Sequence, residues 1–335
     1  MLRYLFRRLA NYFVLLIAAV SMAYMLAGTQ LNPRSMLIEQ ELTKGQKVSY
    51  EEVVASVDTR LTKWNINPED SVFTRFWTWL QNIFLRWDWG YSPRGESVTE
   101  EIGRRAMVSL QLVVLGFIIG ILVGIALGAW TAMRQYTASD RVATAISIIV
   151  LSTPTVVIAV FLQIGVTKLN QELGFQLINF VGQRSAIQPD GMLPQLLDRL
   201  NHLILPTISM SLGGIAQYSR YQRNLMLDTL GADYVRTARA KGLRYGKAVR
   251  KHALRTSLIP MTTFTAFGMT TLVLGAAMTE QVFGWQGMGI YSINTISGQD
   301  INGTVAVVAF SGVMILAGAL LSDILVAVID PRVRA

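Results

Sequence analysis

Side chains able to catalyse a reaction or bind a metal are scarce in this chain. Its 335 residues include no cysteine and two histidines, His202 and His252, which stand far apart in the sequence. Thiolate nucleophiles, disulfides and thiolate metal sites are therefore excluded. A histidine metal centre or a Ser–His catalytic pair is not expected either. We expect no catalytic residue, no metal and no cofactor, and hence a protein that is not an enzyme.

A nucleotide-binding loop is also missing. The nearest stretch, Gly242 to Ala248, has three residues between its glycines, and it ends in alanine. A phosphate-binding loop has four residues between the glycines, with serine or threonine at the end to hold magnesium. Any energy that this protein uses must therefore come from a partner.

The most unusual pattern of charge lies in a basic segment without proline, from Arg220 to Arg255. Small alanines lead up to Gly242, which is typical of a short helix with a glycine C-cap. A second helix is expected from about Tyr245 to Leu258. A short helix of small residues suits docking into a groove of another protein, where the arginines would pair with carboxylates. Two alternatives are that the bases only set membrane orientation, or that they hold anionic lipid headgroups.

The elements that carry this segment are expected to be membrane helices. Hydrophobic types make up 52% of the chain and charged types 15%, whereas soluble domains average about 25% charged residues. Mean hydropathy is +0.39. A spanning helix needs roughly 20 mostly apolar residues. Six stretches qualify: Leu9–Gly28, Met107–Thr131, Val142–Thr167, Leu203–Ser219, Ile259–Thr279 and Val305–Ile329. The first is too long an apolar run to favour a cleaved signal peptide.

Lysine and arginine positions predict the orientation. They gather in four places: the N-terminus, the loop after the second stretch, the basic segment, and the tail with Arg332 and Arg334. If there are six spans, these four places lie on the same side of the membrane. The loop between the fifth and sixth stretches has neither residue type. We therefore expect a multi-pass protein of the inner (plasma) membrane, in contact with membrane lipid, with both termini in the cytoplasm. The net charge of +9 is then a signal of topology, and nucleic acid is not an expected partner.

Three parts are expected along the chain. Residues 1–28 hold the N-terminal tail and first span, 29–105 an extracytoplasmic subdomain, and 106–335 a transmembrane core with the cytoplasmic loop 220–258. Within the subdomain, the aromatic-rich stretch from Phe73 to Trp89 would lie along the membrane interface, anchor the subdomain or contact substrate.

Glycines in the second span repeat at every fourth position. Gly116, Gly120, Gly124 and Gly128 share one helix face, which would let another helix approach closely. That helix could belong to the same bundle or to another subunit. Polar residues such as Ser147 and Gln163 would line a pathway or only join helices by hydrogen bonds.

Ionisable residues are absent from the middle of most spans. Since such groups usually drive coupled transport, a stand-alone secondary transporter or channel for small solutes is the weaker alternative to a transport subunit powered by a partner.

The run DYVRTARAKGL, followed by HALRTSLIP, resembles the cytoplasmic signature (the EAA loop) of ABC-transporter permeases. The whole chain is similar to the oligopeptide/dipeptide subfamily, and to its first permease subunit in particular. Further similar runs are LRYLFRRL, WDWGYS, HLILPTISMSL, EQVFGWQGMGIYSI and VIDPRVR. One departure is Arg236, which stands near the place of an acidic residue in the general signature.

The resemblance implies an all-α polytopic membrane protein with six transmembrane helices, the type I ABC importer permease fold, and a long extracytoplasmic insertion between spans 1 and 2. It implies a second homologous permease subunit, two ATP-binding-cassette ATPases and an extracytoplasmic solute-binding protein. Peptides are the implied substrates, although the subfamily also includes carriers of nickel chelates and sugars. For residues 37–70 the resemblance implies no role, and two roles stay open: contact with the binding protein or plugging of the translocation path. The implied ATPase-coupling residues are Tyr234, Arg236, Ala238, Ala240, Lys241, Gly242 and Leu243.

Overall fold

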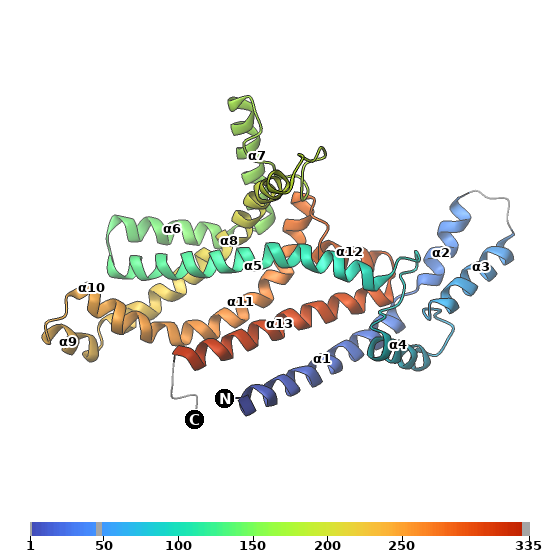
Figure 1. Ribbon diagram of the computed structural model, residues 1–335, viewed down its shortest axis with the longest axis horizontal. Helices are drawn as coiled ribbons and strands as arrows, with labels where there is room; N and C mark the ends of the chain where they lie inside the picture. Colours follow the sequence, from blue (N-terminus) through green and yellow to red (C-terminus); the bar gives the residue numbers. More distant parts are fainter. Residues whose placement is uncertain (1, 45–48, 330–335) are drawn as a thin grey trace. The chain divides into compact units, whose positions relative to one another are not determined.

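The chain folds almost entirely into helices. The structure, a computed structural model, describes residues 2–44 and 49–329. The tail bases Arg332 and Arg334 lie outside the described residues. In chain order the helices are α1 (Leu2–Gln30), α2 (Pro33–Thr43), α3 (Tyr50–Lys63), α4 (Val72–Arg86), α5 (Val98–Met133), α6 (Ala138–Ser152), α7 (Thr155–Leu173), α8 (Met192–Leu230), α9 (Asp233–Ala240), α10 (Tyr245–Ala248), the π-helical turn η1 (Val249–Ala253), α11 (Leu254–Phe283), α12 (Met288–Ser297) and α13 (Ile301–Ile329) (Figure 1). The expected all-α class is confirmed.

Helices of membrane-spanning length occur at several of the expected places. Over the described residues, four helices are long and apolar enough to cross a membrane. They are Phe6–Gln30, Val98–Met133, Thr155–Leu173 and Ile301–Leu321. The expected fourth and fifth spans lie within α8 and α11, which do not meet this criterion over the described residues.

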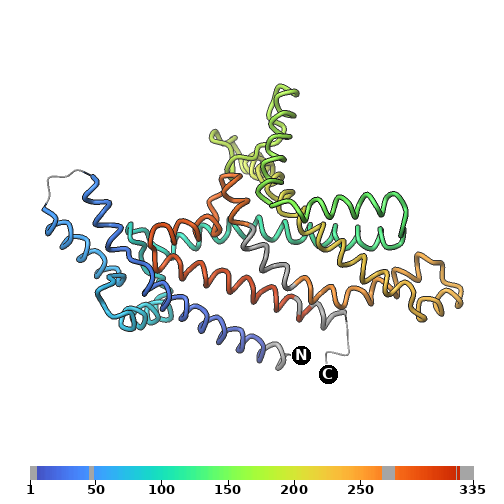
Figure 2. The backbone as a smooth tube through the Cα atoms, turned by 180° about the vertical axis from the view of Figure 1, so that it is seen from behind, coloured from blue at the N-terminus to red at the C-terminus, as the bar shows by residue number. Residues whose placement is uncertain are grey.

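The expected third span, Val142–Thr167, is divided into two helices. Its first half belongs to α6 and its second half to α7, and Thr153 between them has extended backbone angles (φ −100°, ψ 126°). The cause is Pro154, which cannot donate a backbone hydrogen bond and disfavours helical angles in the residue before it. The two helices run in different directions (Figures 1 and 2).

The described residues form two compact units, which we treat separately. The N-terminal unit comprises Leu2–Ser109 and Gln286–Val313, and the core unit comprises Leu110–Trp285 and the chain from Met314. In the N-terminal unit, α2 and α3 pack on each other, and the Arg34 guanidinium donates to the Asp58 carboxylate (Nε–Oδ1 2.6 Å). Buried apolar residues from α1, α2, α3, α4 and α13 form its core.

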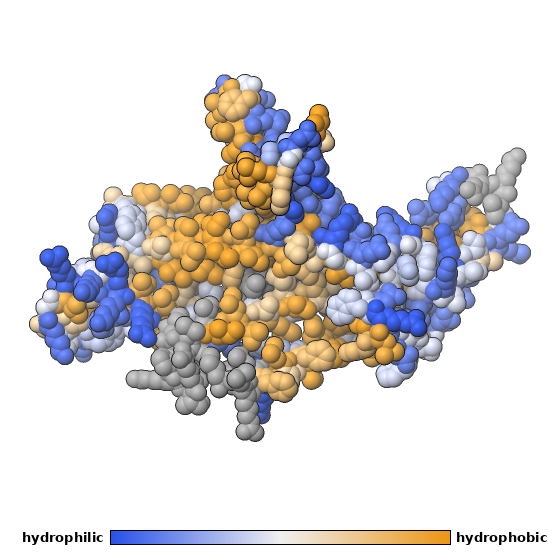
Figure 3. Space-filling model, viewed as in Figure 1, coloured by the Kyte–Doolittle hydropathy of each residue, from blue (hydrophilic) through white to orange (hydrophobic). Residues whose placement is uncertain are grey.

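In the core unit, α8 is the central helix. It packs against α6, α7 and α11, and the glycine face of α5 also lies against it. Apolar side chains cover α5 and α6, whereas hydrophilic side chains cover α9 and α10 (Figure 3). The hydrophilic basic segment therefore stands at one end of this bundle of apolar helices.

Candidate functional site: the basic loop and its base

A short helix interrupts the chain between α8 and α11. After α8 ends, Ala232 has an extended conformation (φ −71°, ψ 146°) and α9 begins at Asp233. At the other end, the Gly242 N–H donates to the Arg239 carbonyl (2.9 Å) and the Leu243 N–H to the Ala238 carbonyl (3.2 Å). This is a Schellman C-cap, and it needs the positive φ of Gly242 (+88°). The expected short helix with a glycine C-cap is confirmed.

The inner face of α9 is buried within the chain itself. Val235 is 2% exposed and Ala238 is 6% exposed. The buried members of this loop core are Ala132, Met226, Val235, Ala238, Ala248, Val249 and Ala253, and Leu243 packs against them. Ala238, which we expected in the coupling element, therefore holds α9 against α5, α8 and η1 and does not form its outer surface. Leu243, also expected there, is partly buried against the same core.

The outer face of α9 is open and basic. Tyr234, Arg236, Ala240, Lys241 and Gly242 are all exposed. The Arg236 guanidinium lies 3.9 Å from the Asp233 carboxylate, but both side chains are exposed, so this pair adds little stability.

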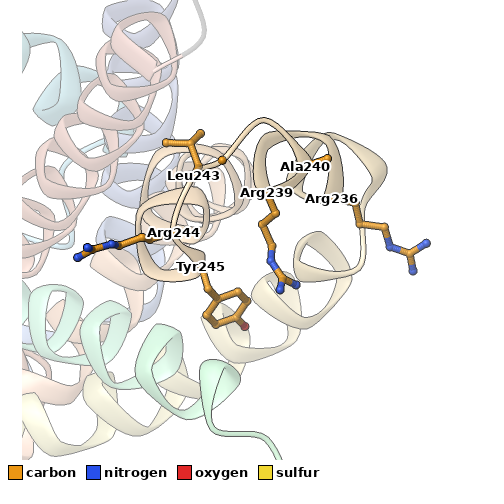
Figure 4. A pocket seen from close by; sticks show the side chains of 7 residues that line it. Arg236, Arg239, Ala240, Leu243, Arg244 and Tyr245 are labelled. Carbon is orange, nitrogen blue, oxygen red and sulfur yellow. The ribbon is translucent and has the colours of Figure 1, made fainter.

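An open hollow of about 480 Å³ lies beside the end of α9. The Arg239 guanidinium sits 5.4 Å from the centre of the Tyr245 ring. Both side chains point to the side opposite Leu243 (Figure 4). The lining residues are Arg236, Arg239, Ala240, Gly242, Leu243, Arg244 and Tyr245. Several guanidinium groups around one hollow form a surface that suits carboxylates, since arginine pairs with them in a bidentate way.

Two polar contacts tie the loop to the helices beneath it. Arg223 on α8 binds Asp140 of α6 through Nε–Oδ1 (2.7 Å) and Nη2–Oδ2 (2.8 Å). Nearby, the buried Gln222 donates to Ser257 Oγ on α11 (2.7 Å). Sequence reasoning missed Asp140. The only signal was one acid next to an otherwise basic turn.

The glycine face of α5 lies against α8. A Cβ atom added at Gly124 would stand 2.6 Å from the Tyr218 Cβ, and one at Gly116 would stand 3.0 Å from the Met210 Cβ. A Cβ at Gly128 would meet the Ser219 carbonyl oxygen. At Gly120, the nearest atom would be the Cα of Gly214 on α8, at 3.4 Å. The close approach that these glycines allow therefore occurs within this chain.

Some polar residues of the expected spans form hydrogen bonds between helices. Ser147 Oγ on α6 lies 3.3 Å from Ser219 Oγ on α8. Gln163 Nε2 on α7 donates to the Val282 carbonyl of α11 (2.9 Å). Among the described residues, no cluster of three or more histidine, aspartate and glutamate side chains could hold a metal ion.

Comparison with known proteins gives a consistent result. The family described as "Binding-protein-dependent transport system inner membrane component" matches residues 116–335. "Oligopeptide transport system permease protein OppB" of Mycobacterium bovis is 43% identical over 334 residues, which cover 100% of this chain and 99% of the relative. "Oligopeptide transport system permease protein AppB" of Bacillus subtilis is 28% identical over 311 residues, or 90% of each chain.

Similarity over a shorter range extends to a further relative and to a solved structure. "Dipeptide transport system permease protein DppB" of Escherichia coli is 31% identical over 285 residues, covering 76% of this chain and 81% of the relative. Among solved structures, a chain of the MetNI methionine ABC transporter in an inward-facing conformation matches with a TM-score of 0.53. It has 16% identity and covers 68% of this chain and 96% of the other. At that identity, the likeness shows the fold alone.

Proposed function

Since this chain belongs to the family of binding-protein-dependent transport system inner membrane components, we propose that it is the first permease subunit of an ATP-driven peptide importer. In this proposal it lines the pathway with a second homologous permease subunit. Two ATP-binding-cassette ATPases supply the energy, and an extracytoplasmic solute-binding protein delivers the peptide. Family membership favours this assembly over a stand-alone secondary transporter or channel, and it confirms the expectation of a transport subunit and not an enzyme.

The peptide substrate is inferred from the relatives. Proteins named as oligopeptide permeases resemble this chain over nine-tenths or more of its length, at 43% and 28% identity. A dipeptide permease resembles a shorter part of it. Because the oligopeptide relatives are similar over the longer range, we infer oligopeptides as the substrate class.

The observation that carries the coupling mechanism is the two-sided construction of α9. Its inner face, Val235 and Ala238, is buried against parts of α5, α8 and η1. Its outer face presents Tyr234, Arg236 and Lys241. A partner that grips the outer face would therefore move the ends of several helices together. Coupling free energies between linked sites are typically about 1–3 kcal/mol, which a few charge-assisted contacts can supply.

The proposed orientation places α9 in the cytoplasm with both termini. It is supported by the concentration of bases in the loop 220–258 and by their absence between the last two expected spans. The division into residues 1–28, 29–105 and 106–335 is part of the same proposal, with the middle part on the opposite side of the membrane.

Reconstitution of the co-purifying complex tests the proposed function. The complex is placed in vesicles with ATP inside or outside, and uptake of a labelled pentapeptide is measured together with ATP hydrolysis. We expect uptake only when the ATPase subunits, the binding protein and ATP are all present. Uptake by the purified chain alone, or hydrolysis that does not respond to loaded binding protein, would contradict the proposal.

A further inference from the structure

An exposed aromatic edge on α4 has no partner within the described residues. Phe73 is 74% exposed, Trp77 60% and Phe84 58%. These positions are four and seven residues apart, so they follow one line along the helix. The opposite side of the helix is buried, with Arg75 and Trp79. The exposed Gln81 lies on the aromatic line itself, four residues after Trp77 and three before Phe84. The helix therefore has a buried face and an exposed aromatic edge.

The depth of α4 follows from its contacts with α1, which belongs to the same unit. Tyr24 of α1 is fully buried, and its ring lies 4.8 Å from that of Trp79. Arg75 Nη2 donates to the Gly28 carbonyl (3.1 Å). A Cβ at Gly28 would stand 3.0 Å from Val72. The two helices therefore cross between Tyr24 and Gly28, within the last two turns of the apolar stretch of α1 (Figure 1).

The level of the membrane boundary is marked by a second contact in this unit. The Asn32 N–H, just after α1, donates to Gln299 Oε1, just before α13 (2.8 Å). The apolar stretch of α1 ends at this level, and that of α13 begins here. Measured along α1 at 1.5 Å per residue, Gly28 and Tyr24 lie about 6 and 12 Å inside this level. Helices that lie in the membrane interface bury their apolar side about 5–10 Å deep.

We propose that α4 lies in the membrane interface, with the edge formed by Phe73, Trp77 and Phe84 seated in the phospholipid of the bilayer. The occupant is lipid because α4 crosses α1 at a level where α1 itself must face lipid. On the side of α1 away from α4, Met22 and Leu26 at this level are 66% and 59% exposed, and apolar side chains cover the visible side of α1 (Figure 3).

The residue types on α4 agree with this placement. Tryptophan and other aromatic side chains are enriched at membrane–water interfaces. Together with the buried Arg75 contact to Gly28, the lipid-seated edge would fix the subdomain formed by α2, α3 and α4 at the end of α1, independently of which solute is transported.

Site-directed spin labelling tests the proposal directly. Because the chain has no cysteine, the full-length variants Trp77→Cys and Phe84→Cys, and the controls Ser56→Cys and Thr59→Cys at exposed positions of α3, each carry one nitroxide. They are reconstituted in vesicles of phosphatidylcholine and phosphatidylglycerol. Collisions with oxygen, which concentrates in lipid, are compared with collisions with a water-soluble nickel chelate. We expect a several-fold higher oxygen-to-nickel ratio at positions 77 and 84 than at 56 and 59.

Other outcomes overturn the proposal. Equal access of the nickel chelate at all four positions would place the aromatic edge in water. Low access of both reagents at 77 and 84 would show that protein covers it. A second measurement avoids thiols: lipids brominated near the headgroup should quench the tryptophan fluorescence of the wild type more than that of Trp77→Phe. Unchanged quenching in Trp77→Phe would also contradict a lipid-seated edge.

Discussion

Arg223 and Asp140 are joined by a bidentate ion pair, with Nε–Oδ1 at 2.7 Å and Nη2–Oδ2 at 2.8 Å. The Tyr136 N–H also donates to Asp140 Oδ2 (3.0 Å). The pair connects the first turn of α6 to the part of α8 that belongs to the basic segment 220–258. It thus gives the loop a rigid link to α6 in addition to the loop core beneath α9.

Removal of either member of this pair should weaken the fold. Asp140→Ala leaves the Arg223 guanidinium without its carboxylate, and we expect a loss of about 2 kcal/mol of stability, as for hydrogen bonds to charged groups. Thermal unfolding of the purified chain measures it. The double variant Asp140→Ala/Arg223→Ala should lose less stability than the sum of the losses in the two single variants. The exposed Asp228→Asn on α8 is the control, and an equal effect there would refute a specific role for the pair.

The same pair predicts a dependence on pH. The Arg223 hydrogen bonds hold the pKa of Asp140 below its ordinary value of 3.8. The folded state therefore favours the ionised carboxyl, and this stabilisation is fully present above pH 3.8. It is lost as the pH falls through the lower pKa of the folded state. Unfolding curves of Asp140→Asn should lack this acid-side loss.

Substitutions in the glycine face of α5 should separate α5 from α8. The added Cβ of Gly124→Ala would stand 2.6 Å from the Tyr218 Cβ, and overpacking of this kind costs about 1–3 kcal/mol. Gly103→Ala is the matched control on the same helix, because no atom lies within 4 Å of its added Cβ. It should be neutral or stabilising by up to about 1 kcal/mol. If both variants unfolded at the same temperature, close packing at Gly124 would be ruled out.

The two faces of α9 should respond differently to an added negative charge. Ala238→Glu places a carboxylate in the loop core, so the loop should lose its structure and become open to proteolysis. Arg236→Glu changes only the exposed face, so protease resistance should stay at the wild-type level. Peptide uptake by the reconstituted complex should fall in both variants. Loss of protease resistance in Arg236→Glu would show that the outer face is also structural.

A buried acid in the N-terminal unit predicts a second pH effect. Asp300 is 5% exposed, and burial raises its pKa to about 7. Its Oδ1 accepts from the Gly303 N–H (2.9 Å), while Glu96 adds to the rise and Arg94 opposes it. The protonated form is favoured in the folded state, so stability should fall as the pH rises from about 4 to about 7.

Asp300→Asn isolates this effect, because the amide oxygen can still accept from Gly303 but does not titrate. The variant should have an unfolding temperature that changes less between pH 4 and 7 than the wild type does. An unchanged slope would mean that another group titrates in this range.

The sequence predicts this fold where local rules decide the outcome. Apolar runs give α1, α5 and α13, and the positive φ of Gly242 follows from its place after a short helix. Other features depend on tertiary contacts. Pro154 follows the end of α6, whereas Pro206 and Pro260 lie within α8 and α11. The local sequence does not show which proline breaks a helix and which one a helix accommodates.

The candidate site was predicted as a segment but not as a three-dimensional surface. The sequence predicts that Ala238 and Ala240 of α9 face a partner. Ala240 is exposed, but Ala238 is buried within the chain, because the choice of face depends on residues such as Ala132 and Met226 from distant helices. The partner of Arg223 lies 83 residues away in the sequence. Helical periodicity cannot reveal such a pair.

The central claim is that an ATPase grips the outer face of α9, and photocrosslinking tests it most directly. A photoreactive maleimide is attached to Tyr234→Cys, Arg236→Cys or, as a control at an exposed position outside the loop, Thr59→Cys on α3 within the purified complex. We predict capture of the ATPase subunit from positions 234 and 236 and little capture from 59. Capture of lipid or of the second permease alone from 234 and 236, with no ATPase, would contradict the account.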